Sequence, residues 1–174
     1  MTNSGKFFLG AGLGCVGLIA LIFVGLVTLL VAMPSAEVLP GKAVPAGYKV
    51  ELRKLKILGA DETPIYFYTS GIIGPEEGGT FFSDARVVAY QRGDADETLE
   101  EAAWTEITDV DVSYSDNWLD DTVITVTRTD RTQFVLAVST SGHGDRRYYN
   151  RLMKEWRKKN DTAEPGKAEA DDDE

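Results

Sequence analysis

"TVITVTRTDRTQFVLAVST", residues 122–140, decides the fold of this chain. Two runs rich in β-branched residues, 122–129 and 132–140, flank the dipeptide Asp130-Arg131. A short polar connection between two strand-like runs indicates an antiparallel hairpin. An isolated hairpin is marginal in water, so further strands or a helix must cover its apolar face. The fold therefore depends on what the rest of the chain supplies.

Short β-rich runs precede the hairpin, separated by segments rich in Gly, Asp, Asn and Pro. The strand-like runs are 64–70, 80–84, 85–91 and 103–114, and the turn-like segments are 74–79, 92–98 and 115–121. Turns spaced by about 8–12 residues are typical of an antiparallel sandwich or barrel. Residues 48–58 fit a strand over their first half, but Tyr48, Leu52 and Leu55 share one helical face, which favours a helix.

The periodicity changes after the hairpin. Gly142 and Gly144 interrupt the last strand, and Asp145 suits a helix N-terminus. An apolar stripe at helical spacing then predicts a terminal helix that docks on the sheet; it consists of Tyr149, Leu152, Met153 and Trp156. Four basic residues occupy the opposite face of that helix: Arg147, Arg151, Lys154 and Lys158.

The phrase "PIYFYTSGIIGPEEGGTFFSDARVVAYQ", the alternating "WTEITDVDVSY", the hairpin and the closing "YYNRLMKEW" together resemble bacterial pleckstrin-homology-like domains. The resemblance covers about residues 60–158. It implies about seven antiparallel strands in a pleckstrin-homology-like sandwich or barrel, closed by the C-terminal helix. The resemblance rests on strand order and a hairpin phrase rather than on a catalytic signature. Pleckstrin-homology folds bind lipids or peptides or have no known ligand, so the fold alone does not choose a function.

Residues 7–33 form an uncharged apolar run that predicts a transmembrane helix. Gly12, Gly14 and Gly17 match a dinucleotide-binding pattern, but the six preceding residues are too few for the strand that such a site needs. The run is too long for a signal peptide, so we expect an uncleaved anchor. Gly10 and Gly14 are spaced for a helix–helix contact, which leaves self-association as a hypothesis.

These patterns predict five segments: an N-terminal flank (1–6), the transmembrane helix (7–33), a Pro- and Gly-rich linker (34–47), the pleckstrin-homology-like domain (48–160) and an acidic tail (161–174). The tail has no large apolar residue and is expected to be disordered. Lys42, Lys49 and Arg53 follow the anchor, whereas only Lys6 precedes it. This bias favours a cell-membrane protein with its domain on the cytoplasmic side.

Composition argues against several kinds of chemistry. The net charge of −10 argues against nucleic acid as a partner. The one cysteine, Cys15, lies in the anchor, and the one histidine, His143, lies between two glycines in an expected turn. Asp109 and Asp111 resemble the start of a calcium loop, but Tyr114 stands where that loop requires glycine. We therefore expect no catalytic residue, no metal site and no cofactor.

Charge is distributed unevenly along the domain. Residues 94–121 carry eleven acidic side chains and no basic one, while residues 145–160 carry seven basic and two acidic ones. The leading hypothesis is a non-enzymatic, single-pass membrane protein whose domain is an interaction or scaffold module for a protein partner. The alternatives are an anionic-lipid sensor using the basic terminal helix, and an enzyme with an unrecognised site. Docking of the acidic tail onto that helix is a further hypothesis.

Overall fold

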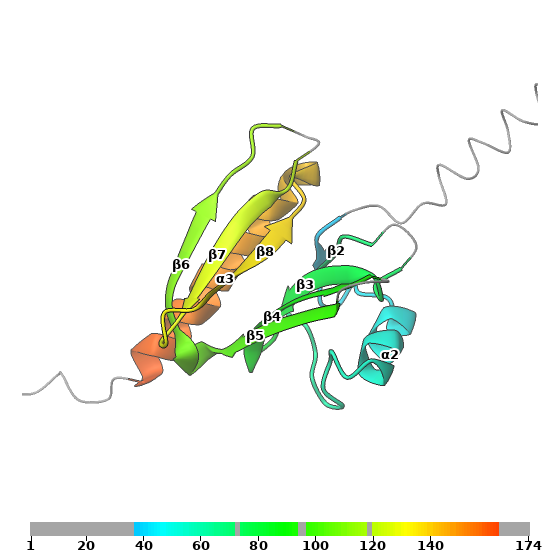
Figure 1. The fold of residues 1–174 in the computed structure, drawn as a ribbon, viewed down its shortest axis with the longest axis horizontal. Helices are drawn as coiled ribbons and strands as arrows, with labels where there is room; N and C mark the ends of the chain where they lie inside the picture. Colours follow the sequence, from blue (N-terminus) through cyan, green and yellow to red (C-terminus); the bar gives the residue numbers. More distant parts are fainter. Residues whose placement is uncertain (1–36, 72–73, 94–96, 118–119, 164–174) are drawn as a thin grey trace, which may run out of the picture. The chain divides into compact units, whose positions relative to one another are not determined.

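The computed structural model describes residues 37–71, 74–93, 97–117 and 120–163 (Figure 1). Within these ranges, no helix has both the length and the apolar character needed to cross a membrane. The expected anchor at 7–33, with Gly10 and Gly14, lies outside the described residues and stays an expectation. The same holds for the tail beyond residue 163.

The described residues form two antiparallel sheets, as the hairpin and the turn spacing predict. The first sheet contains, in spatial order, β1 (Leu39–Pro40), β2 (Tyr66–Thr69), β3 (Gly78–Phe82), β4 (Arg86–Arg92) and β5 (Glu97–Ala103). The second contains β6 (Ile107–Ser113), β7 (Thr122–Arg128) and β8 (Gln133–Val138). The opening stretch is the β7–β8 hairpin, with Thr125 opposite Val135. The prediction of a mainly-β domain with a C-terminal helix is confirmed.

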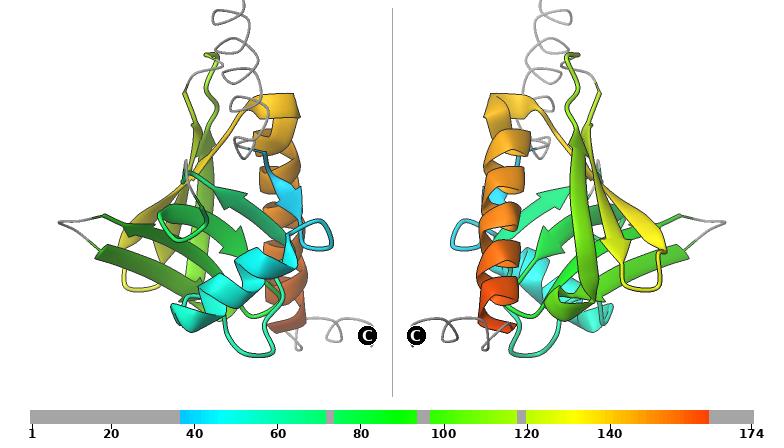
Figure 2. Two further views of the ribbon diagram at one scale, coloured as in Figure 1. Left: turned by 90° about the vertical axis from the view of Figure 1, so that its right-hand side faces the viewer. Right: turned by 90° about the vertical axis from the view of Figure 1, so that its left-hand side faces the viewer.

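The central strands β3 and β4 of the first sheet contribute buried side chains to both faces, which divides the interior into two cores (Figure 1). On one face, Phe82 and Val87 pack against the second sheet and the terminal helix α3 (Gly144–Ala163). On the other face, Phe67 and Phe81 pack beneath α2 (Ala46–Lys54). Figure 2 shows α3 as a long straight helix beside the strands. The helix predicted within 48–58 is confirmed as α2.

The second half of the expected linker is packed into the domain. Val38 and Val44 are 2% and 4% exposed, and each contributes to a different core. Between them, β1 pairs with β2, with Leu39 opposite Phe67. A Cβ atom on Gly41 would clash with the backbone carbonyl of Pro64, so this close approach requires glycine. Burial of these two valines therefore holds a Pro- and Gly-rich segment against the domain, because it removes their apolar side chains from water.

β5 lies where the sequence predicts a loop over 92–98 and no strand after it. Its glutamates are poor strand formers, and Glu97–Glu101 are all exposed. Pairing with β4 supplies the missing stability, because Arg92 Nε lies 3.1 Å from Glu97 Oε1 and Arg86 pairs with Glu101. The position of a charged edge strand therefore depends on its neighbour rather than on its own residues.

The alternating run 103–114 was expected to be one strand, but a 3₁₀ turn, η1 (Trp104–Glu106), occupies its start. Trp104 is 3% exposed, and its indole N–H donates to the carbonyl oxygen of Ser83 at 3.2 Å. This anchoring bends the chain from the first sheet into the second. β6 begins only at Ile107.

The buried stripe of α3 is rotated from the expected one. Tyr148 and Leu152 are both 0% exposed, while Tyr149, Met153 and Trp156 are only partly buried. Tyr148 occupies the centre of the interface between α3 and the sheets, because its ring packs edge to face against Phe82 at a centroid distance of 5.0 Å. Helical spacing in the sequence does not distinguish between adjacent tyrosines.

We expect Trp156→Ala to destabilise the protein by only about 1–2 kcal/mol, less than the ~3–5 kcal/mol typical of a fully buried aromatic residue. The indole is partly exposed, and its main polar contact is one hydrogen bond to the Ile107 carbonyl oxygen at 3.2 Å. Thermal unfolding of the full chain in detergent, followed by near-ultraviolet circular dichroism, measures the effect. Leu152→Ala is the fully buried control, and an equal loss in both variants would contradict the partial burial of Trp156.

Candidate functional site

The N-terminus of α3 is fixed by a tight turn and by a buried carboxylate. Gly142 and His143 have φ angles of 55° and 58°, and His143 is exposed, as expected for a turn residue. A Cβ atom on Gly144 would lie 2.8 Å from a Val38 methyl group, so the helix starts in contact with the segment before β1. Asp145, 4% exposed, accepts a hydrogen bond from Thr122 Oγ1 at 2.8 Å, which joins the first helical turn to β7.

Both acidic side chains within residues 145–160 are directed away from solvent. Asp145 is 4% and Glu155 is 7% exposed, whereas the basic residues of the segment lie mostly at the surface. Glu155 forms an ion pair with Arg151, in which Glu155 Oε1 lies 2.7 Å from Arg151 Nη2. Since the acids are turned inward, the outer side of α3 is more uniformly cationic than the sequence count indicates.

The four predicted interaction residues all lie at the exposed side of α3, each about one turn from the next. We call Arg147, Arg151, Lys154 and Lys158 the basic face. Arg147 Nη1 donates to the carbonyl oxygen of Gly142 at 2.5 Å, which holds its guanidinium near the helix start. Arg147 and Lys154 form no ion pair with any residue that the structure describes.

A shallow groove borders the basic face, and the sequence did not predict it. Its lining comprises Tyr149, Asn150, Met153, Lys154, Arg157, Lys158 and Asp161. Partly buried Tyr149 and Met153 form an apolar floor, and three cations together with the carboxylate of Asp161 border it. Both floor residues belong to the apolar stripe that the sequence predicts to be buried. Their partial exposure follows from the central position of Tyr148.

Aromatic contacts support one side of this groove. The rings of Tyr149 and Tyr114 meet edge to face with centroids 6.1 Å apart. The Arg146 guanidinium lies 4.5 Å from the centroid of the Tyr114 ring, a cation–π contact. Burial, then the neighbouring Tyr114 and Asp111, raise the pKa of the Tyr149 hydroxyl, so this phenol stays a neutral hydrogen-bond donor at physiological pH.

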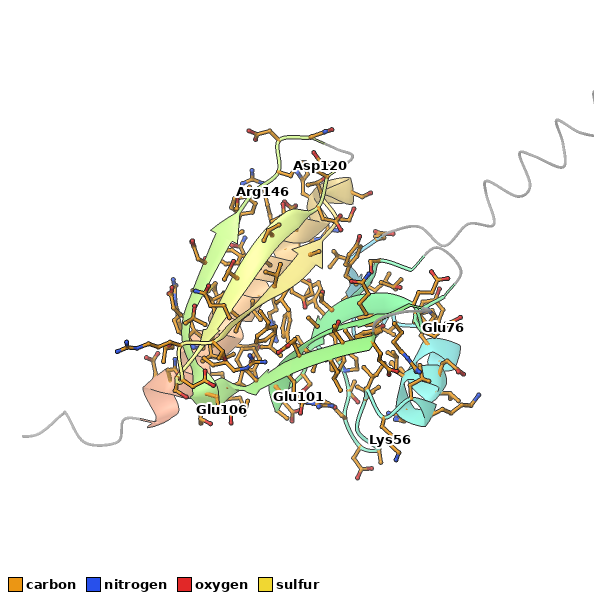
Figure 3. All side chains as sticks on the ribbon, viewed as in Figure 1. Lys56, Glu76, Glu101, Glu106, Asp120 and Arg146 are labelled. Atoms are coloured by element: carbon orange, nitrogen blue, oxygen red, sulfur yellow. The ribbon has the colours of Figure 1, made fainter. Side chains whose placement is uncertain are left out.

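The described acidic residues of the segment 94–121 do not form one acidic surface. Glu100 Oε2 lies 2.6 Å from Arg128 Nη2, and Arg86 and Arg92 neutralise two further glutamates of β5. Figure 3 shows Glu106 at one end of the second sheet, Glu101 on the first sheet, and Asp120 towards the opposite end of the second sheet. The expected contrast between an acidic edge and a basic helix is therefore weaker on the acidic side than in the sequence.

A buried acid–phenol pair links the sheets away from the basic face. Tyr68 Oη donates to Asp121 Oδ2 at 3.1 Å. Burial raises the pKa of both groups, and Asp121 further raises that of Tyr68. Asp109 and Asp111 are exposed on β6, and no group of three His, Cys, Asp or Glu side chains within the described ranges is arranged to hold a metal ion.

The arrangement defines a class: a mainly-β domain of two antiparallel sheets with a basic C-terminal helix. Among solved structures, a DUF1696-family protein with a pleckstrin-homology domain from Shewanella loihica PV-4 aligns with 64% of this chain and 91% of its own. The identity is 13% and the TM-score is 0.43, so no residue role or ligand transfers to this chain. No family model matches the chain, and no curated protein matches it either.

Proposed function

We propose that this chain is a non-enzymatic, single-pass membrane protein whose pleckstrin-homology-like domain is an interaction or scaffold module. We further propose that the partner binds at the basic face of α3 and the adjoining groove. The observation that carries the proposal is the inward burial of Asp145 and Glu155, which leaves the outer side of the helix cationic over residues 145–160, before the exposed Asp161. Such a surface suits an acidic partner, since opposite charges steer association and fix orientation.

The side chains that line the groove indicate which kind of partner could bind there. Its floor of Tyr149 and Met153 accepts small apolar side chains, and its rim of Lys154 and Arg157 accepts carboxylates. An acidic protein segment with interspersed small apolar residues satisfies both requirements. The pleckstrin-homology-like assignment rests on the sequence resemblance and on the order of two sheets followed by a helix. The expected cytoplasmic location rests on the positive charges that follow the anchor.

Anionic lipid is the second candidate ligand, favoured by the same exposed row of cations. An anchor at 7–33 would hold the domain near a bilayer, so a weak attraction to headgroups would act at high effective concentration. Each basic residue near an anionic membrane contributes about 1 kcal/mol, and salt screens the attraction within a Debye length of about 10 Å.

Vesicle flotation separates the two candidates. Residues 37–163 contain every residue of both cores, so this segment is suitable once circular dichroism shows that it is folded. The test variant is Arg147→Glu, Lys154→Glu and Lys158→Glu; Arg151 is kept because it neutralises the buried Glu155. The matched control reverses the same number of exposed lysines near α2: Lys42, Lys54 and Lys56.

If the basic face recognises lipid, the parent and control segments float with anionic vesicles at low salt and the test variant does not. If no segment floats, lipid sensing is wrong. For the leading proposal, a partner should co-purify with the detergent-solubilised full chain and with the control variant, but not with the test variant. Equal recovery of partners by all three chains would contradict a role for the basic face.

A further inference from the structure

α3 ends at Ala163, and the acidic segment 164–174 follows it directly. We propose that this segment folds back and occupies the basic face and groove of its own chain. The contact itself requires only the cationic surface that the structure describes. Its regulatory consequence, competition with an external partner, rests on the proposed function of the same face.

The chemistry of the segment matches that of the surface. Residues 164–174, "EPGKAEADDDE", carry six acidic side chains and one basic one, and the acids concentrate in Asp171–Glu174. The apolar members Ala168 and Ala170 are small enough for a shallow groove. No bulky side chain is present to demand a deep pocket, so recognition is mainly electrostatic and depends strongly on salt.

The segment has the length to reach the basic face as far as Arg151. Arg151 lies twelve residues before Ala163, a distance of about 18 Å at a helical rise of ~1.5 Å per residue. The eight residues after Gly166 extend up to about 26 Å at ~3.3 Å each. Pro165 disfavours continuation of the helix, and Gly166 permits a sharp reversal of the chain. An antiparallel path along α3 brings Asp171–Glu174 past Lys154 towards Arg151.

Tethering favours the chain's own segment over that of a second copy. A flexible linker of this length gives an effective concentration in the millimolar range. Second copies at micromolar concentration compete poorly, although their charges are identical. The pairing covers Lys154, a cation that forms no ion pair within the described part of the chain. A partner must then displace the segment, so binding to this face is autoinhibited.

Zero-length carbodiimide cross-linking of the full chain in detergent tests the contact, because it joins carboxylates to lysine amines that touch. We expect amide links from Asp171–Glu174 to Lys154, with a yield about tenfold above that at Lys54 and Lys56 near α2. The links should form within one chain, as judged by mixing ¹⁵N-labelled and unlabelled protein before peptide mapping. Raising the salt from about 50 to 500 mM should lower the yield about tenfold, since the Debye length shrinks.

Tether proximity alone also produces some cross-linking near the helix end, so a charge variant supplies the control. Arg147→Gln with Arg157→Gln removes two cations and leaves the Lys154 amine available. The proposal predicts a several-fold lower yield at Lys154 in this variant. A yield at Lys154 that is unaffected by both salt and this variant overturns the proposal, and links mainly between isotopically distinct chains overturn the intramolecular contact.

The experiments distinguish failure of the tail contact from failure of the proposed function. If the cross-link forms but no partner or vesicle depends on the basic face, the contact stands and the proposed function is wrong. If both hold, replacing Asp171, Asp172 and Asp173 by Asn and Glu174 by Gln should strengthen partner or vesicle binding by the full-length tail about tenfold. Unchanged binding in that variant contradicts autoinhibition.

Discussion

Tyr148→Ala is expected to destabilise the protein by about 3–5 kcal/mol, the range typical of a large aromatic residue removed from a core. Tyr148 is 0% exposed and is among the largest fully buried side chains. Its ring meets Phe82 at 5.0 Å and Tyr66 at 6.2 Å, so it joins α3 to the first sheet. Thermal unfolding of the full chain, followed by near-ultraviolet circular dichroism, measures the loss.

Tyr148→Phe is the matched control, because it keeps the ring and removes only the hydroxyl. The Thr80 hydroxyl lies beside that of Tyr148, but neither oxygen has a hydrogen-bond partner of good geometry among the described residues. A buried hydroxyl without a partner costs about 1–3 kcal/mol. The phenylalanine variant should therefore be at least as stable as the parent. A loss comparable to that of the alanine variant would contradict the central packing role of the ring.

Arg86→Met is expected to destabilise the protein by about 2–4 kcal/mol, because it leaves a mostly buried carboxylate without its cation. Arg86 Nη2 lies 2.7 Å from Glu62 Oε2, whose side chain is 9% exposed, and the same nitrogen donates to the Ile57 carbonyl oxygen at 2.9 Å. These contacts fix the segment after α2 on the first sheet. Chemical and thermal unfolding of the full chain measure the effect.

Arg92→Met provides the control for this ion pair. The Arg92 and Glu97 side chains are 32% and 63% exposed, and pairs at such positions contribute at most about 1 kcal/mol. Similar losses in the two variants would contradict the distinction between a mostly buried and an exposed pair.

The Arg86 pair also has a pH signature. Burial opposes ionisation of Glu62, but hydrogen bonds from Arg86, Gly59 and Ser83 outweigh it and lower the pKa of the carboxyl group. A lowered folded-state pKa gives stability that is present above the unfolded value of about 4.3 and is lost as the pH falls through the folded value. The stability difference between parent and Arg86→Met should therefore shrink below about pH 4. A difference that stays constant to pH 2 would exclude this carboxylate as the cause.

One part of the candidate surface, the basic face, could be predicted from the sequence, and the other part, the groove, could not. The spacing of Arg147, Arg151, Lys154 and Lys158 predicts one helical face, and the structure places all four at the exposed side of α3. Their role in binding remains a prediction for the flotation and co-purification experiments. The groove beside them was not predictable, because Tyr149 and Met153 fit a buried stripe as well as Tyr148 does. Only packing against Phe82 and Tyr66 determines which tyrosine is central.

By itself, the sequence determined the elements with strong local signals. The β7–β8 hairpin, α2 and α3 follow from β-branched runs, turn residues and helical periodicity, which act within a few residues of chain. The uncharged run at 7–33 likewise predicts an anchor without reference to the rest of the molecule.

Tertiary structure decided the elements whose stability comes from distant partners. β5 is a strand because it pairs with β4, whose Arg86 and Arg92 form ion pairs with its glutamates. Residues 38–44 are packed on the domain because Val38 and Val44 are buried in its two cores. Tertiary structure also decided which charged side chains of α3 face solvent. Asp145 is turned inward to Thr122, and Glu155 is paired with Arg151, so the cations of this part of the helix remain at the surface. Burial and pairing depend on neighbours far along the chain or around the helix, and composition does not encode them.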